Sequence, residues 1–270
     1  PDVCRASFLA YFSGAPWRVG YSEQVNLSKQ SANPGWDCLY THLLHETSVK
    51  HEVEVNLDII RFLGGKVQKD RLEMWFNPED ETFADQLLAS HRYPSGAPLI
   101  AFGLGAGDSK RIWPLSKFIQ LGAWLNKAYG AYILALGGKS DESLGWQLYK
   151  YLPDAVANLS GRTTLRQAGA LLKRCTLFVG NDSGPMHLAA AAGVPVVEIS
   201  CHPIHGLTNH PNSPQRFGPW GVPHTVLQPR TSPKSCAQAC VAEKPHCILN
   251  VPVGAVQDAI RMHLAPQGTR

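Results

Sequence analysis

Asp182, Ser183 and His187 stand close together in one short segment, Gly180-Asn-Asp-Ser-Gly-Pro-Met-His187, and their types and spacing suit phosphate binding. An apolar run precedes the segment and an alanine-rich run follows it, which is typical of a strand that turns into a helix. The first turn of a helix has unpaired backbone N–H groups and a partial positive charge. Ser183 and Gly184 are therefore placed to bind a phosphate oxygen, and Gly184 would let a ligand approach the backbone closely.

Simpler interpretations apply to the same residues. Asp182 or Ser183 could cap the helix, which is what these residue types usually do before an apolar run. His187 could be a packed or capping histidine, although one turn into the helix it would point back toward the phosphate site. The sequence leaves both interpretations open.

Two further loops carry charged side chains. Lys110 and Arg111 are adjacent cations at a helix entrance. Either could neutralise a diphosphate, arginine through two parallel hydrogen bonds and lysine as a point charge, or the pair could be a solvated surface feature. In the other loop, Glu142 follows Gly137-Gly138. Its carboxylate could accept hydrogen bonds from ribose hydroxyls, or it could interact only with the helix dipole.

The elements that must position these loops alternate between β-rich and helical patterns from about residue 98 onward. Strands are expected over residues 99–102, 132–136, 156–159, 176–179 and 194–199, and helices after 114, after 140, over 164–173 and over 185–192. Repeated strand–helix units with apolar strands predict an α/β fold with a parallel sheet covered on both faces. Such sheets bind ligands at the carboxyl ends of their strands, where the three loops lie.

The sequence predicts two domains and a tail. Residues 1–95 are expected to form part of an N-terminal α/β domain, with a strand at 17–21 and helical patterns around 59–63 and 83–88. Residues 96–250 are expected to form a nucleotide-sugar-binding domain, and residues 251–270 a C-terminal helix and tail. The linker is expected at 91–98, which is rich in Pro, Ser and Gly. Residues 1–5 contain neither an initiator Met nor the start of a signal peptide, so we expect the sequence to begin inside a longer protein.

The composition excludes several classes of protein. With 270 residues and 44% hydrophobic content the chain can bury a sizeable core. The formal charge of +4 is mild and no basic run is present, which argues against nucleic-acid binding. No apolar stretch is long enough to predict a transmembrane helix. The odd number of cysteines, seven, favours a reducing compartment, so the cytoplasm is the expected location.

Cys236, Cys240 and Cys247, with His246 beside the last, require separate consideration because thiolates and imidazoles are zinc ligands. Their spacing matches no common zinc motif. Small buried cysteines or a local disulfide are therefore favoured over a metal site, and no metal ligand is predicted.

The sequence from Asp182 to Pro195, DSGPMHLAAAAGVP, resembles the D-[ST]-G-x-x-H-x-A-A-A-x-G-x-P motif of glycosyltransferase family 9, the lipopolysaccharide heptosyltransferases. Trp113-Pro114 after a basic residue, the Gly137-Gly138 loop and Thr163-Thr164-Leu165 before a helix resemble that family in the same order. The resemblance covers roughly residues 98–264 well and 6–65 faintly.

The resemblance implies a GT-B fold, in which two Rossmann-like domains enclose a cleft, here with an incomplete N-terminal domain. It also implies donor-binding roles for eight residues. Asp182, Ser183, Gly184 and His187 would surround the diphosphate and sugar, Glu142 would meet the ribose, Thr163 would approach the adenine, and Lys110 or Arg111 would contact phosphate. The family's basic residue stands two places before the tryptophan, at Arg111, but Lys110 stays an alternative.

The implied activity is metal-independent, inverting transfer of a heptose or related sugar from an ADP-sugar to a lipopolysaccharide core or other lipid-linked saccharide acceptor. The nucleotide sugar is a substrate, so no cofactor is expected. The implied location is the cytoplasm, with peripheral contact at the inner face of the inner membrane. The family's catalytic base belongs to an opening strand and Gly-Asp loop that these 270 residues do not contain, so no catalytic residue is named.

Two other functional classes remain as alternatives. Nucleotide-sugar 2-epimerases also combine two domains with a D-S-G loop, but they tend to carry acidic residues after it, where this sequence has His187 and an alanine run. A non-catalytic nucleotide-binding protein is the other alternative, since no base is identified.

Overall fold

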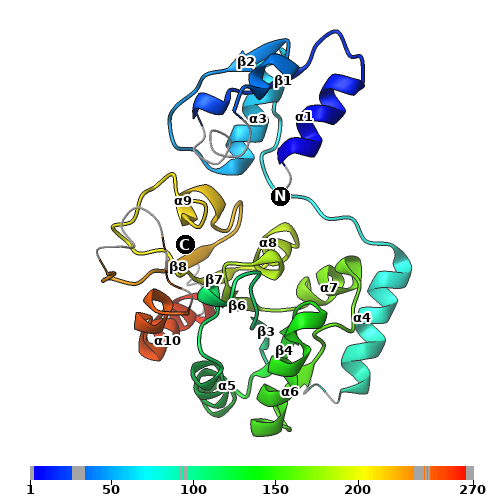
Figure 1. Cartoon of the computed structure of the whole chain (residues 1–270). Coiled ribbons are helices and arrows are strands. Elements are labelled where there is room, and N and C mark those ends of the chain that lie inside the picture. Colours follow the sequence, from blue (N-terminus) through cyan, green and yellow to red (C-terminus); the bar gives the residue numbers. More distant parts are fainter. Residues whose placement is uncertain are drawn as a thin grey trace. The chain divides into compact units, whose positions relative to one another are not determined.

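The computed structural model describes residues 3–25, 34–91, 93, 96–233, 240, 242 and 244–265. The chain forms two compact units, residues 1–70 and residues 71–270 (Figure 1).

The first unit is small and contains two short parallel strands with two helices. Its elements are α1 (Val3–Phe12), β1 (Val19–Tyr21), β2 (His42–Leu44) and α3 (Glu52–Phe62), and β1 pairs with β2. Short 3-10 helices span Glu23–Val25 and Trp36–Leu39. The strand expected near Trp17–Tyr21 and the helix expected around Ile59 are confirmed, whereas the sequence did not predict α1 and β2.

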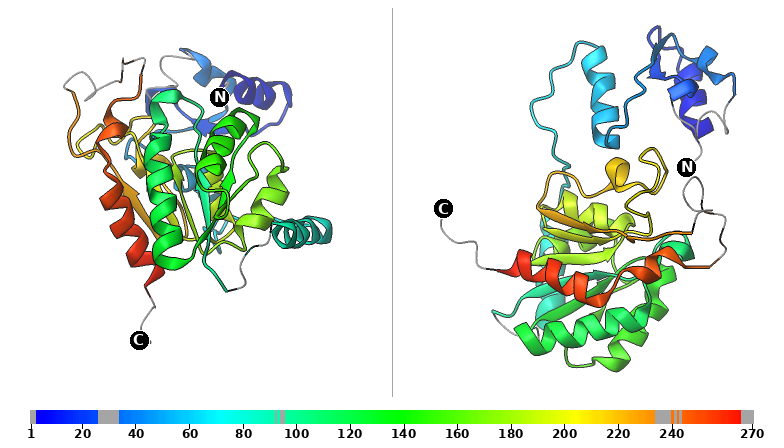
Figure 2. Two further views of the ribbon diagram at one scale, coloured as in Figure 1. Left: turned by 90° about the horizontal axis from the view of Figure 1, so that it is seen from below. Right: turned by 90° about the vertical axis from the view of Figure 1, so that its left-hand side faces the viewer.

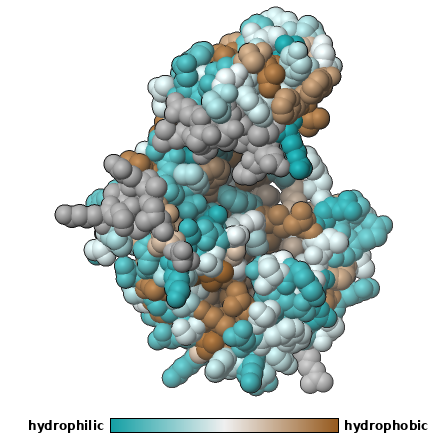
Figure 3. Space-filling model, viewed as in Figure 1, coloured by the Kyte–Doolittle hydropathy of each residue, from teal (hydrophilic) through white to brown (hydrophobic). Residues whose placement is uncertain are grey.

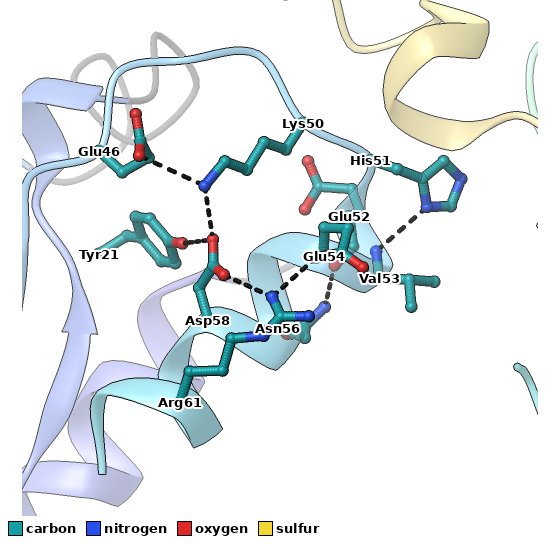
Figure 4. Close-up of polar contacts among 10 residues, drawn as sticks. All are labelled: Tyr21, Glu46, Lys50, His51, Glu52, Val53, Glu54, Asn56, Asp58 and Arg61. Carbon is teal, nitrogen blue, oxygen red and sulfur yellow. Dashed lines mark hydrogen bonds and ion pairs between the residues drawn. The ribbon is translucent and has the colours of Figure 1, made fainter. Parts of the chain in front are cut away.

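A polar network fixes α3 to the rest of the first unit (Figure 4). Asp58 on α3 accepts hydrogen bonds from the Tyr21 hydroxyl at 3.2 Å, the Lys50 ammonium at 2.9 Å and the Arg61 guanidinium at 2.6 Å. Burial and the nearby Asp58 carboxylate raise the pKa of Tyr21 to about 12. The network therefore joins β1, the loop before α3 and α3 through one carboxylate.

The first unit buries few large apolar side chains and exposes several. Phe8, Leu9 and Phe12 of α1 are 43%, 73% and 77% exposed, and Figure 3 shows apolar side chains on the surface of the first unit. Most of the buried core among the described residues therefore lies in the second unit.

The second unit is built on one parallel sheet of six strands. The strands are β3 (Leu99–Gly103), β4 (Tyr132–Leu136), β5 (Val156–Asn158), β6 (Leu177–Asn181), β7 (Val196–Ile199) and β8 (His224–Leu227), in the order β5-β4-β3-β6-β7-β8. The chain runs outward from β3 in one direction, returns to the other side of β3 at β6, and continues outward. This is the Rossmann order, and it confirms the predicted parallel α/β sheet. The sequence did not predict β8.

Helices cover both faces of this sheet (Figure 2). On one face lie α5 (Leu115–Tyr129), α6 (Glu142–Tyr151) and α10 (Val253–Leu264); on the other lie α4 (Pro78–Ser90), α7 (Leu165–Leu172) and α8 (Gly184–Ala191). A short helix, α9 (Pro214–Phe217), precedes β8. Alternate β3 residues supply the two cores: Ile100 and Phe102 pack on the first face, and Leu99 and Ala101 on the second.

Helix α4 packs with the second unit, although the sequence-based division at residue 95 placed it in the first domain. Arg174 at the end of α7 forms ion pairs of 2.7 Å with Glu81 and with Asp85 of α4. Phe83 and Leu87 pack against the same core as Leu99. The division between the units therefore lies near residue 70, and α10, which packs on α5 and β7, also belongs to the second unit.

Candidate functional site

The strongest candidate site lies where β3 and β6 meet. These two parallel strands are neighbours, but the chain leads from β3 to β4 on one side and from β6 to β7 on the other. Parallel sheets of this order bind ligands at the carboxyl ends of such a strand pair. The two strand ends approach closely: Gly103 pairs with Gly180, and a Cβ on Gly180 would lie 2.7 Å from the Gly103 carbonyl oxygen. The loops that follow both strands therefore start side by side.

Asn181, the last residue of β6, holds these two loops together. Its Oδ1 accepts a hydrogen bond from the Trp113 backbone N–H at 2.9 Å, and its Nδ2 donates to the Leu104 carbonyl at 2.9 Å. The indole N–H of Trp113 donates to the Val251 carbonyl at 3.0 Å. Asn181 and Trp113 are fully buried. Sequence reasoning missed Asn181 as a positioning residue; the signal was an amide directly after a buried strand and directly before the phosphate-binding motif.

Arg111 is the cation that contacts the Asp182 loop. One guanidinium nitrogen of Arg111 lies 2.8 Å from the Asp182 carboxylate and also donates to the Asp182 carbonyl oxygen. Burial raises the pKa of Asp182, while the positive charge of Arg111 and, to a smaller extent, the interaction with His187 lower it. Asp182, His187 and Arg111, predicted as donor-binding residues from two separate loops, are thus brought together.

Lys110 lies in a different environment from its neighbour. Its ammonium is 3.5 Å from the Asp108 carboxylate, and both residues line a cavity of about 270 Å³. Cys201 and His202, from the loop after β7, line the same cavity. Lys110 therefore remains available to a ligand that extends beyond the Arg111–Asp182 pair.

The start of α8 is not capped by the side chains that could have capped it. The Ser183 hydroxyl donates to the Asn181 carbonyl at 3.1 Å, and the Asp182 carboxylate is paired with Arg111. Gly184 is exposed, and apart from its chain neighbours and its own helix no atom of the described residues lies within 4 Å of the position where its Cβ would be. Neither Asp182 nor Ser183 caps α8, so the simple-cap interpretation is wrong for this structure, and the space beside Gly184 is open.

Glu142 begins α6, in the loop after β4. Its carboxylate lies 2.6 Å from the Lys139 ammonium, and the hydrogen bond with Lys139 lowers the pKa of Glu142. This loop lies against the loop after β3, because a Cβ on Gly105 would lie 1.9 Å from Oδ1 of Asp141. Glu142 is therefore on a loop that directly adjoins the one carrying Arg111.

Thr163 lies one strand further along, in the loop after β5. The Gly161 backbone N–H in this loop donates to the Gly137 carbonyl at 3.0 Å, so the loops after β4 and β5 also touch. Thr164, rather than Thr163, caps α7 by accepting from the Gln167 backbone N–H. The predicted residues thus form a row along the carboxyl edge of β5, β4, β3 and β6.

Glu198 on β7 is a buried acid that the sequence analysis did not select. It pairs in register with Gly180 and is completely buried. Burial, and then the charge of Asp182, raise its pKa to about 8. A lone acidic residue inside the apolar run 194–199 was the available signal, because charged side chains are rarely buried without a partner.

Cys240 and Cys247 are both free thiols, so the local disulfide considered from the sequence does not join these two. Cys240 Sγ lies 3.8 Å from Nε2 of His246, and Cys247 is buried. Cys236 lies outside the described residues. Within the described part of the chain, no three His, Cys, Asp or Glu side chains are grouped so that they could hold a metal ion. In the same residues, no helix combines the length and apolar character needed to cross a bilayer.

The model of glycosyltransferase family 9 (heptosyltransferase) matches residues 1–246, including every candidate site residue. The chain belongs to glycosyltransferase family 9. The lipopolysaccharide heptosyltransferase 2 of Salmonella typhimurium is 37% identical over 214 residues, which are 74% of this chain and 57% of that protein. The resemblance seen in the sequence is thereby confirmed.

Two solved structures of this family have the same fold. The family 9 glycosyltransferase of Veillonella parvula superposes with a TM-score of 0.77 at 22% identity, over 96% of this chain and 70% of that chain. The ADP-heptose lipopolysaccharide heptosyltransferase II of Escherichia coli gives a TM-score of 0.71 at 20% identity, over 100% and 76%. These similarities confirm the predicted GT-B fold class. The chain spans 36% to 57% of the length of the first curated relatives it matches.

Proposed function

We propose that the second unit binds the ADP part of an ADP-heptose, or a related ADP-sugar, and that the chain takes part in transferring the sugar to a lipopolysaccharide core acceptor. The observation that supports this proposal is the Arg111–Asp182 ion pair beside the uncapped first turn of α8. Backbone N–H groups at the start of a helix and guanidinium groups both recur in the phosphate-binding sites of proteins.

In this proposal the loops along the sheet edge contact successive parts of the donor. Arg111, Ser183 and Gly184 contact the diphosphate, and Asp182 and His187 lie beside the sugar. Glu142 accepts hydrogen bonds from the ribose, Thr163 lies by the adenine, and Lys110 extends the positive charge. The family membership and the named activities of the relatives support these roles, which rest on position along the sheet edge.

The chemical contribution of these residues would be electrostatic. When the acceptor hydroxyl attacks the anomeric carbon with inversion, negative charge grows on the departing ADP. Arg111, Lys110 and the N-terminal dipole of α8 would stabilise that charge without a metal ion. The base that removes the acceptor's proton is not assigned to any residue of this chain. A cytoplasmic location, and contact with the membrane surface that carries the acceptor, are part of the same proposal.

Nothing in the comparisons favours the isomerase alternative, because the matched family consists of glycosyltransferases. A nucleotide-binding protein without turnover is distinguished by experiment. Calorimetry with ADP measures binding, and chromatography of ADP released from ADP-heptose in the presence of a core acceptor measures transfer. ADP binding without ADP release would support the non-catalytic alternative, and the absence of ADP binding would refute the proposed function.

Gly184→Val tests the phosphate position specifically. Because no other segment among the described residues lies within 4 Å of the Gly184 Cβ position, valine there would clash with no neighbouring segment, and its methyl groups would occupy the space in front of the helix. We expect ADP affinity to fall at least ~10-fold, since charge-assisted hydrogen bonds are each worth roughly 1.5–3 kcal/mol. Since a β-branched residue before Pro185 is disfavoured in the helical conformation, thermal stability should fall by about 1 kcal/mol, which leaves the protein folded under the conditions of the binding assay.

Gly254→Val is the matched control. Gly254 is also an exposed glycine in the first turn of a helix, α10, with no atom within 4 Å of its Cβ position. The Gly254→Val substitution should leave both thermal stability and ADP affinity unchanged. Equal ADP affinity in the Gly184 variant and this control would show that the start of α8 does not hold the diphosphate.

A further inference from the structure

Glu198 is a buried carboxyl group beside the Arg111–Asp182 pair. It lies on β7 directly opposite Gly180 of β6. Asp182 follows β6 and is two residues after Gly180 in the sequence. Val196, two positions earlier on β7, packs in the core on the face covered by α7 and α8. Since side chains alternate along a strand, Glu198 points to that same face.

The residues around Glu198 compensate a negative charge on it only in part. The side chain is 0% exposed, and neither carboxylate oxygen has a hydrogen-bond partner among the described residues. The nearby guanidinium of Arg111 is engaged with the carboxylate and carbonyl of Asp182, and its Nε is itself buried without an acceptor. An ionised carboxylate in such a position is strongly disfavoured.

The other groups near Glu198 do not change this conclusion. The charge of Arg111 and the hydroxyl of Ser200, which follows β7, lower the pKa of Glu198 less than burial and Asp182 raise it. Burial raises the pKa of Cys201 to about 11, so this thiol stays neutral in mildly alkaline solution. His187, from α8, interacts with Asp182, and the β8 residue opposite Glu198 is the apolar Val226.

An arriving diphosphate would make ionisation of Glu198 still less favourable. Arg111 and Asp182 cancel each other's charge, so an ionised Glu198 would give this trio a net negative charge. A nucleoside diphosphate adds further negative charge within a few ångströms of Arg111. The repulsion between the diphosphate and an ionised Glu198 would be relieved by one proton on Glu198.

We propose that Glu198 must carry a proton when a nucleoside diphosphate binds beside Arg111, so that binding in mildly alkaline solution takes up one proton from the solvent. The proton resides on a carboxylate oxygen of Glu198, and no bond to the nucleotide forms. This inference rests on the proposed function, because it requires the diphosphate to lie next to the Arg111–Asp182 pair.

Calorimetry of ADP binding to the whole chain tests the proposal. Measurements at about pH 8.5 in two buffers with different ionisation enthalpies give the number of protons exchanged, and Kd is followed from about pH 7.5 to 9.5. In this range phosphate groups are fully ionised and imidazoles are ordinarily neutral. Because a carboxyl group with a pKa of about 8 is roughly three-quarters ionised at pH 8.5, we expect uptake of up to about three-quarters of a proton per ADP there, rising toward one at higher pH. Kd should rise toward about tenfold per pH unit above the Glu198 pKa.

Glu198→Gln, a neutral replacement of the same shape, should abolish the uptake and flatten the pH dependence. Two control variants, Glu79→Gln on the exposed side of α4 and Cys201→Ser close to Glu198, should retain the proton uptake and the pH dependence of Kd. ADP binding to the wild type with no uptake, or with proton release, would refute the inference alone, and so would uptake that persists in Glu198→Gln. If that variant fails to fold, the wild-type measurements decide the question. Failure of ADP to bind at every pH would overturn the proposed function as well.

Discussion

Replacing Asn181 by alanine should destabilise the second unit strongly, because this amide holds the loops after β3 and β6 together. The substitution removes the acceptor of the Trp113 backbone N–H and the donor to the Leu104 carbonyl, and both of these residues are buried. Each buried polar group left without a partner costs roughly 1–3 kcal/mol. We therefore expect a loss of about 2–6 kcal/mol, toward the lower end if water fills the space left by the amide.

Thermal unfolding of the second unit measures this loss. For a unit of this size, each kcal/mol lowers Tm by roughly 2–4 °C, so the expected decrease is about 4–24 °C. Asn126→Ala is the matched control, because Asn126 is exposed and makes one long hydrogen bond, 3.3 Å, to the Ala131 carbonyl. It should cost less than about 1 kcal/mol.

Asn181→Asp refines the prediction through its dependence on pH. An ionised carboxylate would still accept from the Trp113 N–H but would repel the Leu104 carbonyl oxygen, whereas a protonated one could donate to it. Burial should raise the pKa of the new carboxyl group, so its stabilising form is present at low pH and lost as pH rises. The variant should therefore be closer to wild type at pH 5 than at pH 8. An alanine variant as stable as Asn126→Ala would refute the role assigned to Asn181.

The remaining predictions concern three titratable groups. Folding raises the pKa of Glu198 from 4.5 to about 8, so protonated Glu198 stabilises the folded state. This stabilisation is complete below pH 4.5, is lost as pH rises to about 8, and amounts to at most roughly 5 kcal/mol. Urea unfolding should show this loss in the wild type and not in Glu198→Gln, and equal profiles would contradict the assignment. Burial, and then His210, lower the pKa of His202 to about 4, so stability from neutral His202 is present above pH 6.5 and lost toward pH 4. Its imidazole NMR shifts should be the same at pH 7 and pH 5, and a titration midpoint near 6.5 would disprove this. Asp58→Asn should lower the pKa of Tyr21 from about 12 toward 10, as read by ultraviolet difference spectroscopy; an unchanged midpoint would leave burial as the whole cause.

The sequence by itself determined the elements whose signals are local. The sequences of β3, β4 and β6 are nearly continuous apolar runs, without the alternating polar residues of a half-exposed strand. The structure buries every residue in these strands. The helix boundaries followed from turn and cap chemistry: α5 ends at Gly130, whose φ of 62° suits glycine, and Thr164 caps α7. The row of donor-binding candidates followed because each loop comes directly after such a strand.

Elements without a strong local signal were missed or placed differently. β8 is a half-exposed edge strand that begins with His224, and α1 exposes much of its apolar surface, so neither shows the pattern of a buried element. The sequence pattern of α4 predicted a helix correctly but could not show that Arg174, 93 residues after Glu81, would bind it to the second unit. Membership of a domain depends on contacts between distant residues.

Only the tertiary structure decided how the charged residues of the site divide their roles. Lys110 and Arg111 are adjacent cations in the sequence, yet Arg111 reaches Asp182, 71 residues away, while Lys110 faces the cavity beside Asp108. Glu198 became significant for the same reason, since its buried position next to Asp182 depends on the pairing of β6 with β7. Residue type fixes which charges are available, but the electrostatic energy depends on distance and burial, and both are set by the assembled sheet.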